Sequence, residues 1–232
     1  MPTLDSTVLV SIAKQLNLLA VFAFIVPVLV CIRRWPLLSP SSRKLILTAL
    51  LITLALNLLS ETGRRLWNTN IVFLYCITWT ETLFLGWAYY QAFHMPRARQ
   101  LLLGAGAVFI LVAVAELVLN EFSGEQTYTR LTQSMLLVGA ALAYFEQILH
   151  ELRNIRLERD PMFLVSVGVT LYYSGTLMVF VLEDSMQKQH QNSQIWMMYI
   201  IQAVLSIIFT VLVAWALHHA ARRTEEQFNR SF

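Results

Sequence analysis

Seven apolar stretches, each long enough to cross a membrane as a helix, constrain the fold of this chain more than any other feature. A membrane-spanning helix needs roughly 20 apolar residues for a hydrocarbon core of about 30 Å. The chain is 57% hydrophobic and 13% charged, whereas a soluble domain carries about 25% charged residues. We therefore expect an all-α polytopic membrane protein, a seven-transmembrane-helix bundle that forms one domain over residues 1–232. The expected spans are 8–32, 45–64, 71–94, 101–120, 131–150, 162–182 and 195–220.

The distribution of basic residues predicts the orientation of this bundle. With the amino terminus outside, the cytoplasmic segments hold 12 Lys and Arg side chains and the other side holds 5. An excess of Lys and Arg in short loops marks the cytoplasmic side, so we expect the amino terminus outside and the carboxyl terminus in the cytoplasm. The opening segment MPTLDST has no Lys or Arg, unlike a signal peptide, so the first stretch is expected to remain as a helix.

The stretch 71–94 carries a carboxylate at its middle. Thr78, Thr80, Glu81 and Thr82 interrupt an otherwise apolar sequence. A charged side chain at the bilayer centre costs about 2.5–3.5 kcal/mol on insertion scales, so such a residue normally faces the protein interior or a wet cavity. We expect 71–94 to be the central helix, with Glu81 directed inward. The alternative role for Glu81 is a structural hydrogen bond to a neighbour such as Tyr172.

Other polar residues are predicted at the same depth or nearer the outside, on several different spans. If they converge, they form a polar pocket for a small ligand, open to the outside, in which Lys14 neutralises one or more carboxylates. Some of them could instead extend from a last helical turn to the lipid headgroups, and Glu61 could pair with Arg65 four residues later. The candidate ligand-binding residues are Glu81, Lys14, Asn57, Glu61, Glu116, Gln133, Tyr172, Tyr173 and Gln202.

The histidines suggest a metal site only weakly. The adjacent pair His218 and His219 would point about 100° apart on a helix, and no HExxH sequence is present. The serines of the spans have no histidine at matching depth, which a Ser–His pair needs. We expect no metal, no cofactor and no catalytic residue. Four histidines lie at the expected cytoplasmic ends of spans: His94, His150, His218 and His219.

The fifth span is predicted to continue into water beyond the membrane. Phe145, Ile148, Leu149, Leu152 and Ile155 keep the i, i+3, i+4 spacing, while charged residues occupy the other face. We expect a cytoplasmic helical extension to about residue 158, whose apolar face is suited to docking a partner helix.

Prolines predict two local features. Pro27 should kink the first span by removing one backbone hydrogen bond. Asp160 and Pro161 have the order of a helix N-cap followed by proline at the first helical position.

Two segments resemble a known bacterial region. They are 78–90 (TWTETLFLGWAYY) and 144–180 (YFEQILHELRNIRLERDPMFLVSVGVTLYYSGTLMVF). The glutamate in the third span, the charged extension of the fifth helix and the Tyr-Tyr-x-Gly of the sixth span are similar to a seven-span region of some bacteria. That region precedes a histidine kinase module or is encoded as a small separate membrane protein near one. The resemblance implies a sensory role in a bacterial plasma membrane, with any kinase a separate protein because this chain ends at Phe232.

Three functions are therefore compatible with the sequence. The first is a membrane sensor or accessory receptor with an outward-facing pocket, signalling through the extension of the fifth helix. The alternative is a transporter of small solutes or ions, and the third is an intramembrane metal-dependent hydrolase. The inner halves of the spans look drier than the outer halves, which favours a one-sided pocket over a transport path that reaches both sides. Because the serines and histidines give no catalytic or metal-binding pattern, an enzyme is less favoured than a protein without catalytic activity. Expected partners are the lipid bilayer, a small ligand and a cytoplasmic protein, and not nucleic acid.

Overall fold

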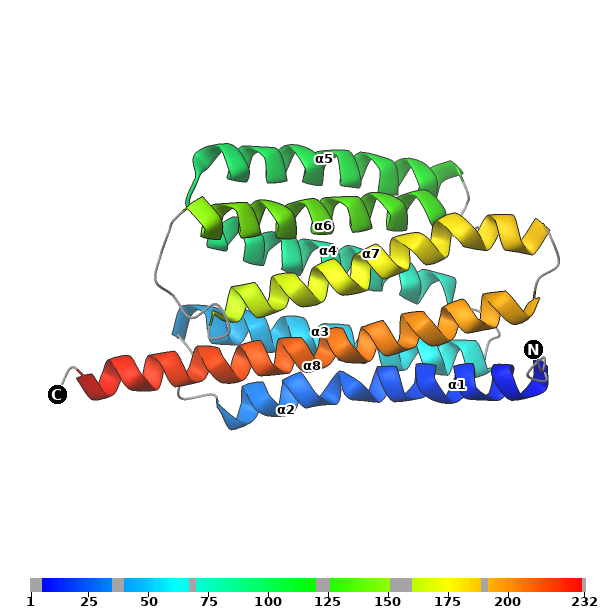
Figure 1. The fold of residues 1–232 in the computed structure, drawn as a ribbon, viewed down its shortest axis with the longest axis horizontal. Helices are drawn as coiled ribbons and strands as arrows, with labels where there is room; N and C mark the ends of the chain where they lie inside the picture. The colour runs from blue at the N-terminus through cyan, green and yellow to red at the C-terminus, as the bar shows by residue number, and fades with distance from the viewer. Residues whose placement is uncertain are drawn as a thin grey trace.

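The computed structural model describes residues 6–34, 40–66, 70–119, 126–150, 160–188 and 192–230. Almost all of these residues are helical, and these ranges contain no strand. The helices run side by side along one long axis, and α8 projects beyond the others at one end (Figure 1). The helices are α1 (Ser6–Ala23), α2 (Ile25–Arg33), α3 (Pro40–Leu66), α4 (Ile71–Ala92), α5 (Pro96–Leu119), α6 (Thr127–His150), α7 (Pro161–Lys188) and α8 (Asn192–Arg230).

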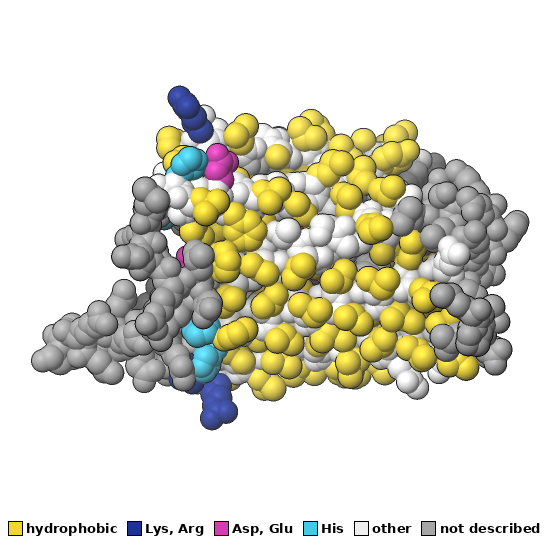
Figure 2. Space-filling view, viewed as in Figure 1, with side chains coloured by type: hydrophobic (Ala, Val, Ile, Leu, Met, Phe, Trp, Pro, Cys, Tyr) yellow, Lys and Arg dark blue, Asp and Glu magenta, His cyan; other side chains and the backbone are white. Residues whose placement is uncertain are grey.

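Six helical stretches in the described ranges are long and apolar enough to cross a membrane. Their mean hydropathy lies between 1.4 and 2.6. Apolar side chains cover the middle of the face seen in Figure 2, whereas the basic, acidic and histidine side chains lie near one end. Soluble proteins do not expose an apolar surface of this extent. The chain is therefore a multi-pass membrane protein. The six stretches are Val8–Arg33, Lys44–Leu66, Ile71–Ala92, Pro96–Leu119, Pro161–Val179 and Gln194–Ala221.

Helix α6 is not among these six stretches, although a span was predicted there. Its sequence includes several polar residues, of which Thr129, Gln133, Ser134 and Gln147 are buried. It contacts α4, α5 and α7, so these polar groups face protein rather than the surroundings of the bundle.

The helices form a ring around a central space. Helix α8 contacts α1 and α2, these contact α3, and the ring continues through α4, α6 and α7 back to α8. Helix α5 lies outside the ring, against α6 and α4. The prediction that 71–94 is a central helix is therefore wrong: α4 is one member of the ring. Depth alone cannot distinguish these arrangements, because it says nothing about how many helices surround a span.

Both proline predictions are confirmed. The first apolar span is interrupted at Phe24, between α1 and α2. The Phe24 backbone N–H donates to the Val21 carbonyl three residues earlier (3.3 Å), whereas an α-helix would use the carbonyl four residues earlier. Pro27 cannot supply an N–H to the carbonyl four residues earlier, which accounts for a break at this place. Pro161 is the first residue of α7, and the Asp160 side chain accepts a hydrogen bond from the Met162 N–H (3.3 Å).

The contact between α7 and α8 depends on small residues. A Cβ atom added at Gly168 would lie 3.0 Å from the ring of Phe209, and one added at Gly175 would overlap the Leu205 side chain. Small residues allow two membrane helices to approach closely, and dispersion contacts then hold them together. This contact keeps the inward-facing side chains of α7 and α8 next to one another.

The predicted cytoplasmic extension of the fifth span falls on residues 151–159, outside the described residues. The described helix α6 continues unbroken to His150.

Candidate functional site

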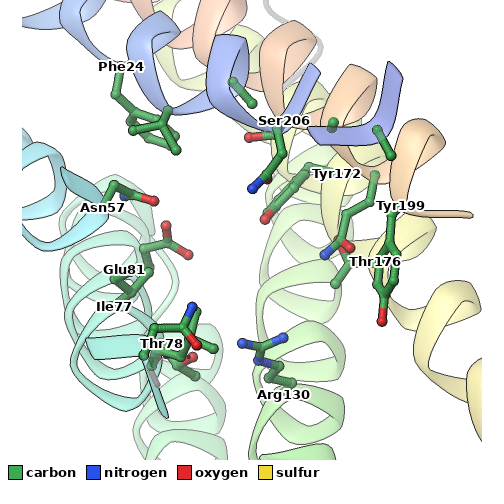
Figure 3. Close-up of a pocket in the computed structure, with 18 of the residues that line it drawn as sticks. Phe24, Asn57, Ile77, Thr78, Glu81, Arg130, Tyr172, Thr176, Tyr199 and Ser206 are labelled. Carbon is green, nitrogen blue, oxygen red and sulfur yellow. Dashed lines mark hydrogen bonds between the residues drawn. The ribbon is translucent and has the colours of Figure 1, made fainter. Parts of the chain in front are cut away.

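A cavity of about 470 Å³ lies inside the ring of helices. Every member of the ring except α2 contributes lining residues, and α5 contributes none. Figure 3 shows side chains from several helices directed into this space. Seven of the nine predicted site residues line it: Lys14, Asn57, Glu81, Gln133, Tyr172, Tyr173 and Gln202.

The cavity reaches only one end of the bundle, the end at which α1 begins. Lining residues there lie in terminal turns of their helices or next to them, as Arg64, Asn70, Arg130 and Trp196 do. Toward the other end of the bundle, α4, α6, α7 and α8 pack in a cluster that includes Tyr89, Tyr144 and Phe209, and α2, α3 and α8 pack around Cys31 and Leu217. None of these five residues lines the cavity. The described residues therefore enclose a one-ended cavity with an apolar floor.

Glu81 projects from α4 into this cavity, as Figure 3 shows. Its carboxylate accepts a hydrogen bond from the hydroxyl of Tyr173 (3.0 Å), a buried residue of α7. Tyr172 packs edge-on against Tyr173 with ring centroids 4.9 Å apart, and it stacks on Phe209 of α8 at 5.5 Å. The inward direction expected for Glu81 is confirmed, and the bonded tyrosine is Tyr173 rather than Tyr172.

Two of the three threonines around Glu81 donate their hydroxyl protons to the backbone of α4. Thr78 donates to the Leu74 carbonyl (2.9 Å) and Thr82 donates to the Thr78 carbonyl (2.7 Å), each one turn earlier on α4. A threonine bonded in this way adds little polarity to a membrane helix. Glu81 is therefore the polar side chain on this part of α4 that bonds to another helix, through Tyr173.

Gln133 joins α6 to α4 as well as lining the cavity. Its amide donates to the carbonyl of Thr78 (3.2 Å). The side-chain oxygen of Gln126, the residue before α6, lies 3.2 Å from the Thr78 hydroxyl, whose single proton is closer to the Leu74 carbonyl. The Gln126 amide donates to the Ile71 carbonyl (3.5 Å). These bonds hold the wall made by α4 and α6.

Arg130 also lines the cavity from α6, although it was not among the predicted site residues. The expected span began at residue 131, which placed Arg130 in the preceding loop. The helix begins at Thr127, which places Arg130 and Gln133 on one face at i, i+3 spacing. That spacing was the signal available in the sequence. Lys14 and Arg64 are the other basic residues in the lining.

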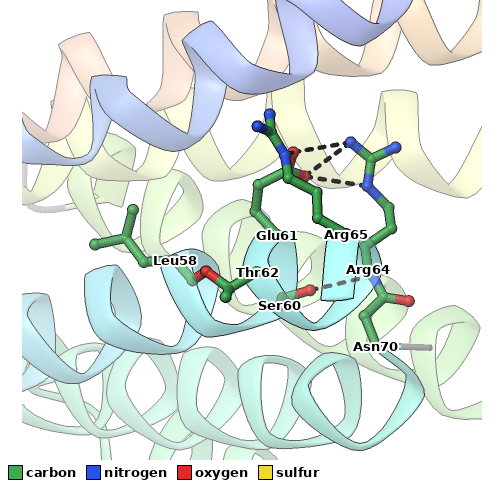
Figure 4. Close-up of polar contacts among 7 residues, drawn as sticks. All are labelled: Leu58, Ser60, Glu61, Thr62, Arg64, Arg65 and Asn70. Atoms are coloured by element: carbon green, nitrogen blue, oxygen red, sulfur yellow. Dashed lines mark hydrogen bonds and ion pairs between the residues drawn. The ribbon is translucent and has the colours of Figure 1, made fainter. Parts of the chain in front are cut away.

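Glu61 was predicted to line the pocket, and this is wrong. Its carboxylate pairs with Arg64 (2.9 Å) and with Arg65 (2.7 Å), both on the same helix (Figure 4). The alternative pairing with Arg65 is confirmed. The nearby Ser60 accepts a hydrogen bond from Asn70 (3.2 Å), which ties the end of α3 to the start of α4. Glu61 thus stabilises the rim of the cavity without facing into it.

Glu116 was also predicted in the pocket, and this is wrong as well. It is 5% exposed and accepts hydrogen bonds from the backbone N–H groups of Tyr128 (3.1 Å) and Thr129 (2.7 Å). These N–H groups belong to the first turn of α6, where no intrahelical acceptor is available and a negative charge is favourable. Glu116 of α5 therefore caps α6 from outside the ring.

Within the described part of the chain, no group of three or more His, Cys, Asp and Glu side chains lies close enough to hold an ion. His94 instead contacts Gln147 of α6. The His94 N–H donates to the Gln147 side chain (3.1 Å), and the Gln147 amide also reaches the Ala92 carbonyl (3.3 Å). Gln147 thus holds the end of α4 against α6.

The helices and the cavity together define the class: a multi-pass helical membrane protein with a one-ended polar cavity inside a ring of helices. Comparison of the chain with family models, with curated proteins and with solved structures found no match.

Proposed function

We propose that this protein is a membrane sensor or accessory receptor that binds a small ligand from outside in the cavity around Glu81. The observation that carries the proposal is the one-ended cavity with a buried carboxylate at its inner limit. Its volume of about 470 Å³ lies within the range of roughly 300–1,000 Å³ that is typical of small-molecule sites. A receptor needs access from one side only.

The proposal includes seven spans with the amino terminus outside. These are the six apolar stretches described above and, in addition, α6. Its 24 residues extend about 36 Å at 1.5 Å per residue, enough for a hydrocarbon core of about 30 Å. Polar residues in α6 are compatible with a span because its neighbours shield them. The excess of Lys and Arg in the segments at the other end of the bundle, away from the cavity mouth, supports a cytoplasmic location for that end.

Helix α6 is the proposed route from the pocket to the cytoplasm. Near the cavity mouth it carries Arg130 and Gln133, and near its other end Gln147 contacts the end of α4. The hydroxyl of Tyr144 donates to Asp160 at the start of α7 (3.0 Å). A shift of α6 on ligand binding would therefore be transmitted to the segment 151–159, where a separate cytoplasmic partner such as a histidine kinase would bind.

One observation favours transport as the second candidate. The break between α1 and α2 lies at Phe24, which lines the cavity. Interrupted helices beside a cavity are common in secondary transporters. A transporter would expose the same cavity to the cytoplasm at another stage of its cycle, whereas a receptor would keep its floor closed.

Thiol labelling from the two sides distinguishes these candidates. The background carries Cys31→Ala and Cys76→Ala, which remove both native cysteines. Ser206→Cys then reports on the cavity, and Val204→Cys is its control, because Val204 is 41% exposed on the same helix and does not line the cavity. A small, neutral, hydrophilic thiosulfonate is applied to right-side-out and inside-out vesicles, with a membrane-impermeant quencher inside.

The receptor predicts labelling at position 206 only from the outside and no labelling at position 204 from either side. Labelling of position 206 from both sides would favour transport. The absence of labelling at position 206 from the outside would refute the outward-facing pocket.

A further inference from the structure

We propose that the cavity binds a small zwitterion of the amino-acid type, with its ammonium group at Glu81 and its acidic group toward Arg130. This inference rests on the proposed receptor function and adds the chemical class of the ligand. It follows from the separation of opposite charges along the depth of one cavity.

The negative charge lies at the inner limit of the cavity. Within the described part of the chain, Glu81 accepts one side-chain hydrogen bond, from Tyr173, and forms no ion pair with Lys or Arg at 4.0 Å or less. A cation bound beside a carboxylate at membrane depth stabilises the charged form of that carboxylate. Phe24 and Tyr172 also line the cavity, although one face of the Tyr172 ring is covered by Phe209. Glu81 is therefore the group that would bind the ammonium group of the ligand.

The positive charge lies nearer to the mouth. Arg130 lies three residues after the start of α6, near the mouth, whereas Glu81 lies ten residues after the start of α4, deeper in the cavity. A guanidinium group has five N–H donors, so it can bind a ligand carboxylate in addition to a protein partner, with two parallel hydrogen bonds. Arg64 and Lys14 add positive charge to the same lining, although Arg64 also pairs with Glu61.

This arrangement favours a zwitterion over ligands of a single charge. A simple cation would have to pass the basic residues of the mouth before reaching Glu81. A simple anion would be attracted to the mouth but would leave Glu81 without a counter-charge. A zwitterion satisfies both charges in one orientation, and the amides of Asn57 and Gln202 in the lining supply further hydrogen-bonding groups.

The electrostatic half of the proposal is tested with three thiosulfonates of similar size that carry a trimethylammonium, a hydroxyl or a sulfonate group. Each is applied from outside to Ser206→Cys in the background without native cysteines. The basic residues of the mouth act on both charged reagents, so the effect of Glu81 is read from the change that Glu81→Gln causes. Because a charged cleft changes the local concentration of an ion by about 10-fold or more, we expect Glu81→Gln to lower the ratio of the cationic rate to the anionic rate by about tenfold, each rate being taken relative to a free thiol. The rate of the neutral reagent should stay unchanged.

The ligand half is tested by protection of the thiol at position 206. Each of the twenty common amino acids is present while the neutral reagent reacts, and each protecting compound is compared with its matched amine and its matched carboxylic acid. We expect at least one amino acid to protect and both matched analogues to be at least about tenfold weaker, as for the loss of one charged contact worth about 1.4 kcal/mol. In the Glu81→Gln variant, the amino acid should protect no better than its matched carboxylic acid. In the Arg130→Gln variant, it should protect no better than its matched amine. Tyr173→Phe, which retains both charges, should retain both advantages.

The outcomes separate this inference from the function on which it rests. If the neutral reagent does not reach position 206 from outside, the outward-facing pocket itself is refuted. If it does, but Glu81→Gln leaves the rate ratio of the two charged reagents unchanged, no amino acid protects, or a matched analogue protects equally well, the pocket stands and the zwitterion is refuted. Size-exclusion profiles and helical circular dichroism equal to those of the parent show that each variant is folded.

Discussion

The buried carboxylate of Glu116 allows the effect of one substitution on stability to be estimated from its contacts. It accepts two backbone hydrogen bonds, at 3.1 and 2.7 Å, from the first turn of α6. A hydrogen bond to a charged group contributes about 1.5–3 kcal/mol. The two bonds share one carboxylate and one helix end, so their contributions do not simply add. We expect Glu116→Ala to lower the free energy of unfolding by about 3 kcal/mol, and Glu116→Gln by about half as much, because the amide oxygen still accepts one bond.

The measurement is reversible unfolding by sodium dodecyl sulfate in mixed micelles, followed by circular dichroism. The matched control is Glu146→Gln, at the other end of α6, where the glutamate side chain is 74% exposed and its nitrogen–oxygen distance to His150 is 3.7 Å. Exposed pairs contribute about 0–1 kcal/mol, so the control should unfold almost like the parent. Hydrogen exchange locates the effect, because the amides of Tyr128 and Thr129 should exchange faster in Glu116→Ala. If Glu116→Ala is as stable as the control, or if these two amides stay protected, Glu116 does not cap α6.

Two further substitutions test how the helices are held together. Gly175→Leu places a large side chain against Leu205 and should lower the stability by about 1–3 kcal/mol through overpacking. The control is Gly104→Leu on α5, where an added Cβ has no neighbour within 4 Å, and its stability should be almost unchanged. Equal losses for the two variants in the same unfolding assay would contradict the close approach of α7 and α8. Gln147→Leu removes the acceptor of the His94 backbone N–H. The backbone amide of His94 should then exchange faster with solvent, and the free energy of unfolding should fall by about 1–2 kcal/mol. Unchanged exchange at His94 would show that Gln147 does not hold the end of α4.

The helices could be predicted from the sequence because apolar stretches of sufficient length have few other structures available in a membrane. Their ends were less certain. The expected fourth span began at residue 101, whereas α5 begins at Pro96. Arg99, which we counted as part of a loop, lies in this helix, where its guanidinium donates to the Phe93 carbonyl (2.8 Å) and lies over the ring of Tyr90. Basic residues at helix ends are thus poor markers of where a helix begins.

Part of the site could also be predicted from the cost of placing polar groups in a membrane. The inward direction of Glu81 followed from its depth, since a charged group facing lipid is costly. The cap formed by Glu116 could not be predicted, because its partners are backbone groups on another helix, and periodicity within one helix does not show how two helices are placed. Arg130 was missed because the expected start of its span came four residues after the start of α6 at Thr127. The orientation of the bundle and its resemblance to kinase-associated sensory regions stay predictions.

The direction of Glu81 is the central claim, and one comparison of labelling rates tests it most directly. In the background that carries Cys31→Ala and Cys76→Ala, Glu81→Cys and Leu83→Cys are each treated from outside with the neutral hydrophilic thiosulfonate. Leu83 lies two residues further along α4 and is 58% exposed on the outer surface of the bundle. A water-filled cavity predicts modification at position 81 at least about tenfold faster than at position 83, because a thiol surrounded by lipid is not ionised and does not meet the reagent. Equal rates, faster modification at position 83, or no modification at position 81 would contradict the claim that Glu81 faces a cavity open to the outside.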